Sequence, residues 1–165
     1  MHTHKEMLGM LFLLNQTVRE AAYYHDRIAR ITAKEAEIDR RCAASEKVAG
    51  CGPDATDRTV AEFELKIAET EARHRREMLR EEIEAERYFI EDYERQAREI
   101  RKKLPSPALQ LFDRLTGLTP GDVMSYEKDR ACAKCAGRLD DAIMRRLEVI
   151  MEITQCPHCD RILEV

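Results

Sequence analysis

The sequence has no tryptophan, few other aromatic residues and little glycine or proline. Aromatic residues make up 5% of the 165 residues and charged residues 36%, a composition that suits long charged helices better than a large globular core. Proline is absent from residues 6–49, where Gly9 is the only glycine, and neither residue type occurs in residues 57–103. Because proline and glycine are the strongest interrupters of helices, we expect one long helix in each range.

The sequence also lacks the motifs of several function classes. It contains no glycine-rich phosphate loop and no nucleophile–base pair at a credible spacing, so we expect that the protein is not an enzyme. The net charge of −4 does not favour attraction of the whole chain to nucleic acid.

No hydrophobic run is long enough to cross a membrane. The apolar run Met7–Leu14 is too short for a membrane span and lacks the features of a signal peptide, so we interpret it as helix core. Six cysteines without a signal peptide indicate a reducing, cytoplasmic location.

Apolar or small residues recur at steps of three and four along both helical ranges, which is typical of a coiled-coil seam. In the first range the predicted seam residues are Leu11, Leu14, Val18, Ala21, His25, Ile28, Ile31, Ile38 and Cys42. In the second they are Phe63, Ile67, Thr70 and His74 and then, after a phase shift, Leu79, Ile83, Ile90, Tyr93, Ala97, Ile100 and Leu104. Successive three-residue steps around Ile28 predict a local overwinding of the first helix.

A short segment rich in glycine, proline and aspartate, residues 50–57, separates the two helical ranges. A short connection between helices of matched length favours an antiparallel pair, so we predict a coiled-coil hairpin over residues 1–104 with its turn near 50–57. Pro105 and Pro107 end the second helix, and a short helix and linker follow over residues 105–121. Residues 122–165 form the third predicted domain.

Two Cys-x-x-Cys pairs stand out in the third domain: Cys132 with Cys135, and Cys156 with Cys159. Two residues between cysteines let one tight turn supply two thiolates, and the 20-residue insert lets the chain return with the second pair. This spacing predicts one structural Zn²⁺ per chain, with four thiolate ligands and no open position for water. Iron remains an alternative because a tetrahedral four-sulfur site suits both metals.

Disulfides and a redox dithiol are the other interpretations of these cysteines. Disulfides need an oxidising compartment, and a redox Cys-x-x-Cys usually stands alone near a βαβ pattern, which this sequence lacks. We expect strands over residues 122–126, 148–154 and 161–165 and a helix over residues 140–148. Gly137 is expected to take a left-handed conformation in the first turn, and metal binding to supply much of the folding energy of this small domain.

Taken together, the chain resembles the bacterial zinc-ribbon proteins that have four cysteine ligands and an N-terminal coiled-coil hairpin. The resemblance rests on Gly137 and Leu139 after the first cysteine pair, on Pro157 within the second, and on the segment Arg161–Leu163. The resemblance implies a non-enzymatic cytoplasmic protein. Members of this family have been linked to an alternative sigma factor, to RNA, and to flagellar or type III secretion components. One departure is Asp160, where glycine is more typical.

Two function classes follow: an adaptor for a protein partner, as a monomer or homodimer, and a nucleic-acid-binding ribbon. Residues 119–165 hold seven Lys and Arg against nine Asp and Glu, whereas a phosphate-binding surface needs a basic face. Arg138, Arg145 and Arg146 are the candidate basic patch, and Tyr126 is the only aromatic residue available for base stacking. We therefore favour the adaptor over the nucleic-acid-binding regulator.

Overall fold

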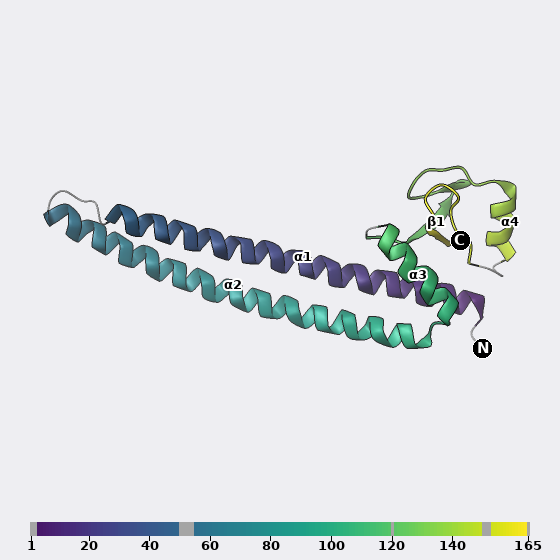
Figure 1. Ribbon diagram of the computed structural model, residues 1–165, viewed down its shortest axis with the longest axis horizontal. Helices are drawn as coiled ribbons and strands as arrows, with labels where there is room; N and C mark the ends of the chain where they lie inside the picture. Colours follow the sequence, from purple (N-terminus) through teal and green to yellow (C-terminus); the bar gives the residue numbers. More distant parts are fainter. Residues whose placement is uncertain (1–2, 50–54, 120, 150–152, 165) are drawn as a thin grey trace. The chain divides into compact units, whose positions relative to one another are not determined.

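The computed structural model describes residues 3–49, 55–119, 121–149 and 153–164. Two long helices, α1 (His4–Ala49) and α2 (Ala55–Lys103), are followed by the shorter α3 (Ser106–Leu118) and by a small sheet that carries the cysteines. The mainly helical fold class is thus confirmed (Figure 1). Of the predicted turn at 50–57, residues 50–54 lie outside the described part, and α2 has already begun at Ala55.

The chain divides into two compact units. One contains Met1–Ala21 together with Asp92–Val165, and the other contains Ala22–Glu91. Each long helix contributes to both units. The domain division at residues 104 and 121 stays a prediction.

In the unit Ala22–Glu91, α1 and α2 run antiparallel. Arg27 of α1 contacts Glu86 of α2 at 2.9 Å, whereas Asp39, further along α1, contacts Arg76, earlier in α2, at 2.7 Å. As the residue number rises along α1, the number of the contacting residue in α2 falls, as it does in an antiparallel pair. The predicted hairpin arrangement is therefore observed in this unit.

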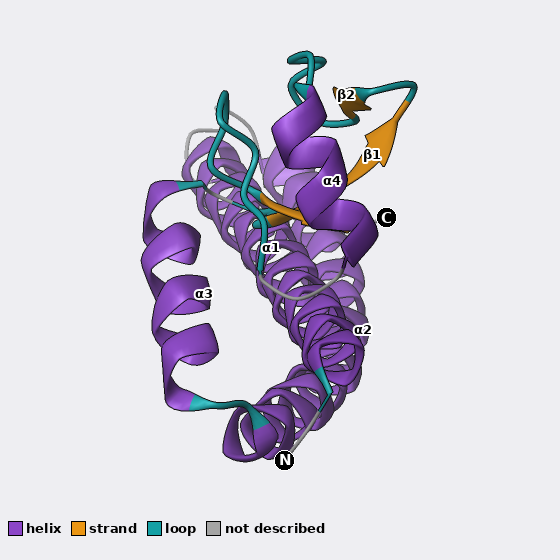
Figure 2. Cartoon of the chain, turned by 90° about the vertical axis from the view of Figure 1, so that its right-hand side faces the viewer, coloured by secondary structure: helices purple, strands orange, loops and turns teal. Residues whose placement is uncertain are grey.

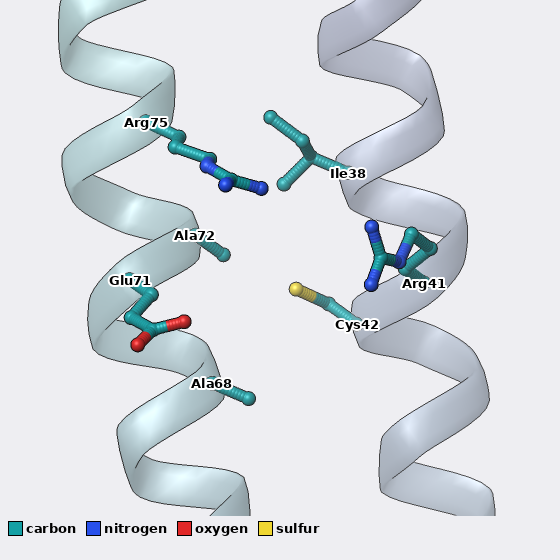
Figure 3. Close-up of a pocket in the computed structure, with 7 residues that line it drawn as sticks. All are labelled: Ile38, Arg41, Cys42, Ala68, Glu71, Ala72 and Arg75. Atoms are coloured by element: carbon teal, nitrogen blue, oxygen red, sulfur yellow. The ribbon is translucent and has the colours of Figure 1, made fainter.

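The α2 face that packs against α1 in this unit differs from the predicted one. Small residues fill it: Ala72 is buried and Ala68 half-buried, and Figure 3 shows both opposite Ile38 and Cys42 of α1. The predicted seam residues of this stretch, Phe63, Ile67, Thr70 and His74, are all exposed. That part of the prediction was wrong because it assigned the larger apolar residues to the seam. The alanine stripe continues in phase to Leu79 and needs no phase shift.

The α1 seam also departs from the prediction at one position. His25 is exposed, and the neighbouring Tyr24 is half-buried and stacks on Phe89 of α2 with ring centroids 5.0 Å apart. A tyrosine ring buries more apolar area than a histidine imidazole, which explains why Tyr24 and not His25 lies in the seam. With Tyr24 in the seam, the two successive three-residue steps run from Val18 through Ala21 to Tyr24. The prediction had placed them from His25 through Ile28 to Ile31.

In the other unit, one hydrophobic core joins the ends of both long helices to α3 and the sheet. Pro105 precedes α3 in an extended conformation and Pro107 lies in its first turn, where a missing N–H costs no helix hydrogen bond. Phe112 and Leu115 of α3 are each 1% exposed. The buried residues of this core are Leu11, Leu14, Ile100, Leu104, Ala108, Phe112, Leu115, Val123, Met124 and Ile162.

The sheet has the order β2-β1-β3 and lies close to helix α4 (Asp141–Val149) (Figure 2). Strand β1 (Met124–Lys128) is antiparallel to β2 (Ala131–Cys132) and parallel to β3 (Ile162–Glu164).

Residues 148 and 149, predicted as the start of a strand, belong instead to α4. The Asp140 carboxylate accepts a hydrogen bond from the Ile143 N–H at 2.8 Å, which caps the helix, and Leu147 is buried on its inner face. Residues 150–152 of the predicted strand lie outside the described part. Within that part, residues 153 and 154 belong to no strand.

Candidate metal centre

The two Cys-x-x-Cys turns have the same backbone geometry. In the first, the Ala136 N–H donates to the Cys132 carbonyl at 2.8 Å, and the Cys132 N–H donates to the Gly137 carbonyl at 2.9 Å. In the second, the Asp160 N–H donates to the Cys156 carbonyl at 2.9 Å, and the Cys156 N–H donates to the Arg161 carbonyl at 2.8 Å. Each cysteine pair is therefore presented by an equivalent turn.

The left-handed residue of each turn follows its second cysteine. Ala136 has φ 56° and Asp160 has φ 58°. Glycine would adopt this conformation without the Cβ penalty, which explains why glycine is typical at the position of Asp160, and aspartate is among the few other residues that adopt it. Gly137 itself does not have a positive φ, so the expectation of a left-handed Gly137 was wrong.

Gly137 instead permits close contact between the two turns. A Cβ atom at this position would lie 2.3 Å from Cδ2 and 2.6 Å from Cγ of His158, which is within the second turn. The His158 ring thus lies against the backbone of Gly137. Its Nε2 donates to the Arg138 carbonyl at 2.9 Å, so this hydrogen bond also joins the two turns.

The four sulfur atoms form a compact cluster. Cys132 Sγ lies 3.8 Å from Cys159 Sγ, and Cys135 Sγ lies 3.7 Å from Cys156 Sγ. All four lie within 4.8 Å of one another. Four thiolates about 2.3 Å from a zinc ion at the centre of a regular tetrahedron would be about 3.8 Å apart. The cluster therefore has the size and donor set for one tetrahedral metal ion.

The same geometry bears on the alternatives. All four cysteines are free, and the distances of 3.7 and 3.8 Å far exceed the roughly 2.05 Å of a disulfide bond. The two short contacts each join one cysteine of the first pair to one of the second. The sulfurs thus converge on a common centre, which zinc or iron would fit equally.

Burial and hydrogen bonds act on the pKa of both buried cysteines, and the balance between them differs. Burial raises the pKa of Cys132, but hydrogen bonds from the Ser125 hydroxyl and from the Cys135 and Lys134 backbone outweigh it and lower the pKa to about 6. Burial raises the pKa of Cys156 to about 12. Ser125 Oγ lies 3.2 Å from Cys132 Sγ and is itself buried. Because thiolates bind metal, loading the cluster must release protons from the more basic thiols.

Asp122, just before β1, gathers several donors. Its carboxylate accepts from Lys134 Nζ at 2.7 Å, from Asn15 Nδ2 at 2.8 Å and from Arg19 at 3.2 Å. Its backbone carbonyl accepts from Arg161 Nε at 2.8 Å. Lys134 lies between the first two cysteines and Arg161 follows the second pair, so Asp122 ties both turns to α1. Sequence reasoning missed this group, although the polar Asn15 directly after the apolar run Met7–Leu14 was an available signal.

The candidate basic patch lies next to acidic residues. Arg138, Arg145 and Arg146 are exposed, and Arg145 Nε donates to the Asp141 carbonyl at 3.1 Å. Arg138 lines an open cavity of about 610 Å³ together with Arg130, Leu139, Asp140 and Asp141. Binding of nucleic acid by these arginines stays a prediction.

A search of the described helices finds none with the length and apolar character needed to cross a membrane.

The fold and the cluster define a protein with a helical hairpin and a four-cysteine candidate metal centre. The CT398 protein of Chlamydia trachomatis has a similar structure, with a TM-score of 0.50 and 15% identity over 98% of this chain and 86% of that one. The HP0958 protein of Helicobacter pylori matches with a TM-score of 0.39 and 15% identity over 98% of this chain and 85% of the other. No protein-family model matches the sequence, and no curated protein matches it. At 15% identity the likeness to CT398 shows a shared fold.

Proposed function

We propose that the cysteine cluster binds one structural Zn²⁺ per chain through Cys132, Cys135, Cys156 and Cys159. The sulfur separations of 3.7 and 3.8 Å support this assignment, since they equal the edge of a zinc–thiolate tetrahedron. Zinc bound to four thiolates has no position for a substrate or water, so the ion would hold the two turns together and not catalyse a reaction. Elemental analysis of protein purified without added metal tests the assignment. One zinc per chain is expected, and one iron with a visible thiolate absorption would contradict it.

We further propose that the protein is a non-enzymatic, cytoplasmic adaptor that binds a protein partner. Acidic residues outnumber basic ones over residues 119–165, which favours a protein over nucleic acid as the ligand of the ribbon. The family that the sequence resembles suggests a transcription factor or a flagellar or secretion component as the partner class. Free thiols at all four cluster positions fit a reducing compartment.

Affinity capture from host lysate, with and without nuclease, tests the adaptor proposal. We expect a specific protein to be retained after nuclease treatment and to bind the purified chain directly in calorimetry. Loss of every partner after nuclease, together with one enriched RNA or DNA, would overturn the proposal in favour of a nucleic-acid-binding regulator. Replacement of Arg138, Arg145 and Arg146 by alanine is the matched control. It should leave protein capture unchanged, whereas under the nucleic-acid alternative it should abolish the capture of RNA or DNA.

A further inference from the structure

Helix α2 carries a second apolar stripe, separate from the alanine stripe that packs on α1. Phe63 is 65% exposed, Met78 57% and Tyr88 70%. The positions of this outer stripe are Val60, Phe63, Ile67, Thr70, His74, Met78, Glu81, Ala85 and Tyr88. At about 100° per residue, the outer stripe lies roughly 140° around the helix from the alanine stripe. It therefore cannot contribute to packing within the hairpin.

The outer stripe is symmetric about His74. Its positions lie 4, 7, 11 and 14 residues before His74 and at the same four distances after it. An antiparallel copy of α2, related by a two-fold axis at His74, would therefore place every stripe residue opposite another stripe residue. Phe63 would face Ala85, a large side chain against a small one, and Val60 would face Tyr88. This alternation is what close packing of two helices requires.

Charged residues along the edges of the outer stripe match in the same arrangement. In an antiparallel pair each edge faces its own copy, so Arg73 would lie near Glu77 of the second copy. Glu81 is a stripe position that faces Ile67 of the second copy, and its carboxylate would turn to the edge toward Lys66. None of these residues forms an ion pair among the described residues of the single chain.

Like charges oppose this arrangement at two places, because Arg73 would lie as close to its own copy as to Glu77 and one pair of carboxylates would also meet. Glu64 would lie near Glu82 of the second copy. Glu82 already contacts Arg27 within the hairpin at 3.6 Å, which offsets part of the repulsion. The favourable pairs of Lys66 with Glu81 and of Arg73 with Glu77 each occur twice by symmetry and offset the remaining repulsion.

We propose that the outer stripe is the interface of an antiparallel homodimer with its two-fold axis at His74. The stripe extends over about 42 Å of helix, at 1.5 Å per residue. Each copy offers five large exposed apolar side chains, two of them aromatic, and an aromatic side chain buries about 150–250 Å². The buried area is then near the lower end of specific interfaces, about 1,200 Å². Because this area is small for a specific interface, we expect weak association and choose a micromolar concentration range for the test.

Sedimentation of the full chain over about 1–300 µM tests association. We expect a concentration-dependent dimer for the wild type and a monomer throughout for Phe63→Glu with Met78→Glu. Leu118→Glu is the matched control, because Leu118 is equally exposed, at 67%, but lies outside the outer stripe. A wild-type chain that stays monomeric, or a control variant that also loses the dimer, overturns the proposal.

Charge exchange tests the register. Lys66→Glu and Glu81→Lys should each weaken dimerisation about tenfold at low salt, and the double variant should restore it. These substitutions keep exposed residues exposed, and circular dichroism of each variant confirms that the helices are intact. Single variants without effect, or a double variant weaker than both, would exclude this register.

Cross-linking tests the position of the two-fold axis. His74→Cys, in a chain with Cys42→Ser and Cys51→Ser, should form a disulfide-linked dimer on mild oxidation, because only a residue at the axis faces its own copy. Ala85→Cys in the same background is the control. It lies about 16 Å along the helix from the axis and should not cross-link to itself. Equal cross-linking at both positions would contradict the two-fold axis at His74.

Discussion

Asn15 of α1 is hydrogen-bonded through both side-chain polar atoms to the segment that leads into β1. Its Nδ2 donates to Asp122 at 2.8 Å, and its Oδ1 accepts from the Val123 N–H at 3.1 Å. Asn15 is 5% exposed, so neither bond is readily replaced by water. The first long helix is thus fastened to the cysteine-bearing sheet by one buried amide.

Replacing Asn15 by alanine should lower the free energy of unfolding by about 1–3 kcal/mol, because the buried Val123 N–H would lose its acceptor. Urea unfolding followed by circular dichroism measures the change. Gln16→Ala is the control, since Gln16 is the next residue on the same helix but is exposed. An equal loss in both variants would contradict a specific role for the Asn15 amide.

Asp122 should make the stability of the protein depend on pH. Burial raises the pKa of its carboxyl, but hydrogen bonds from Lys134 and Asn15 and the charge of Arg19 outweigh this, so the pKa lies below its ordinary value. A lowered folded-state pKa stabilises the fold at neutral pH, and this stabilisation disappears as the pH falls through the folded-state pKa. Asp122→Asn should therefore be less stable than wild type at pH 7.

The difference between wild type and Asp122→Asn should shrink as the pH falls below about 4. Unfolding curves for both proteins at several pH values provide the measurement. A difference that stays constant with pH would show that the Asp122 charge makes no contribution.

Gly137→Ala should weaken metal binding, because the added Cβ would overlap the His158 ring and force the two turns apart. Overpacking of this kind costs about 1–3 kcal/mol. Competition against a chromogenic zinc chelator measures the affinity. His158→Ala removes the overlapping ring atoms, so the double variant should bind metal more tightly than Gly137→Ala alone. A double variant as weak as the single one would place the cause elsewhere.

Cys132→Ser, or removal of the metal by a chelator, should unfold the cysteine-bearing sheet and leave the long helices intact. The sheet has few buried apolar residues of its own, and four thiolates held together by a metal would replace them. We expect loss of bound metal with little change in the helical circular dichroism signal. Cys42→Ser is the control, since Cys42 lies on α1 far from the cluster in sequence. Full metal retention by Cys132→Ser would contradict the proposed ligand set.

The sequence by itself determined the features that depend on local geometry. Long stretches without proline or glycine allowed only long helices, and the two Cys-x-x-Cys spacings dictated two turns that each present a pair of sulfurs. The end of α2 before Pro105 follows from the steric restriction that proline imposes on the residue before it. Each of these outcomes needs only residues that are close together in the chain.

Only the tertiary structure decided which of two apolar stripes on α2 packs within the hairpin. Periodicity shows that a helix has apolar faces, but the face that is covered depends on the opposing side chains, here Ile38 and Cys42, which fit against alanines. The sequence did not predict the contacts of Gly137 and Asn15, because these contacts too depend on residues far away in the chain. Their partners, His158 and Asp122, are distant in sequence, and only the folded chain brings them into contact.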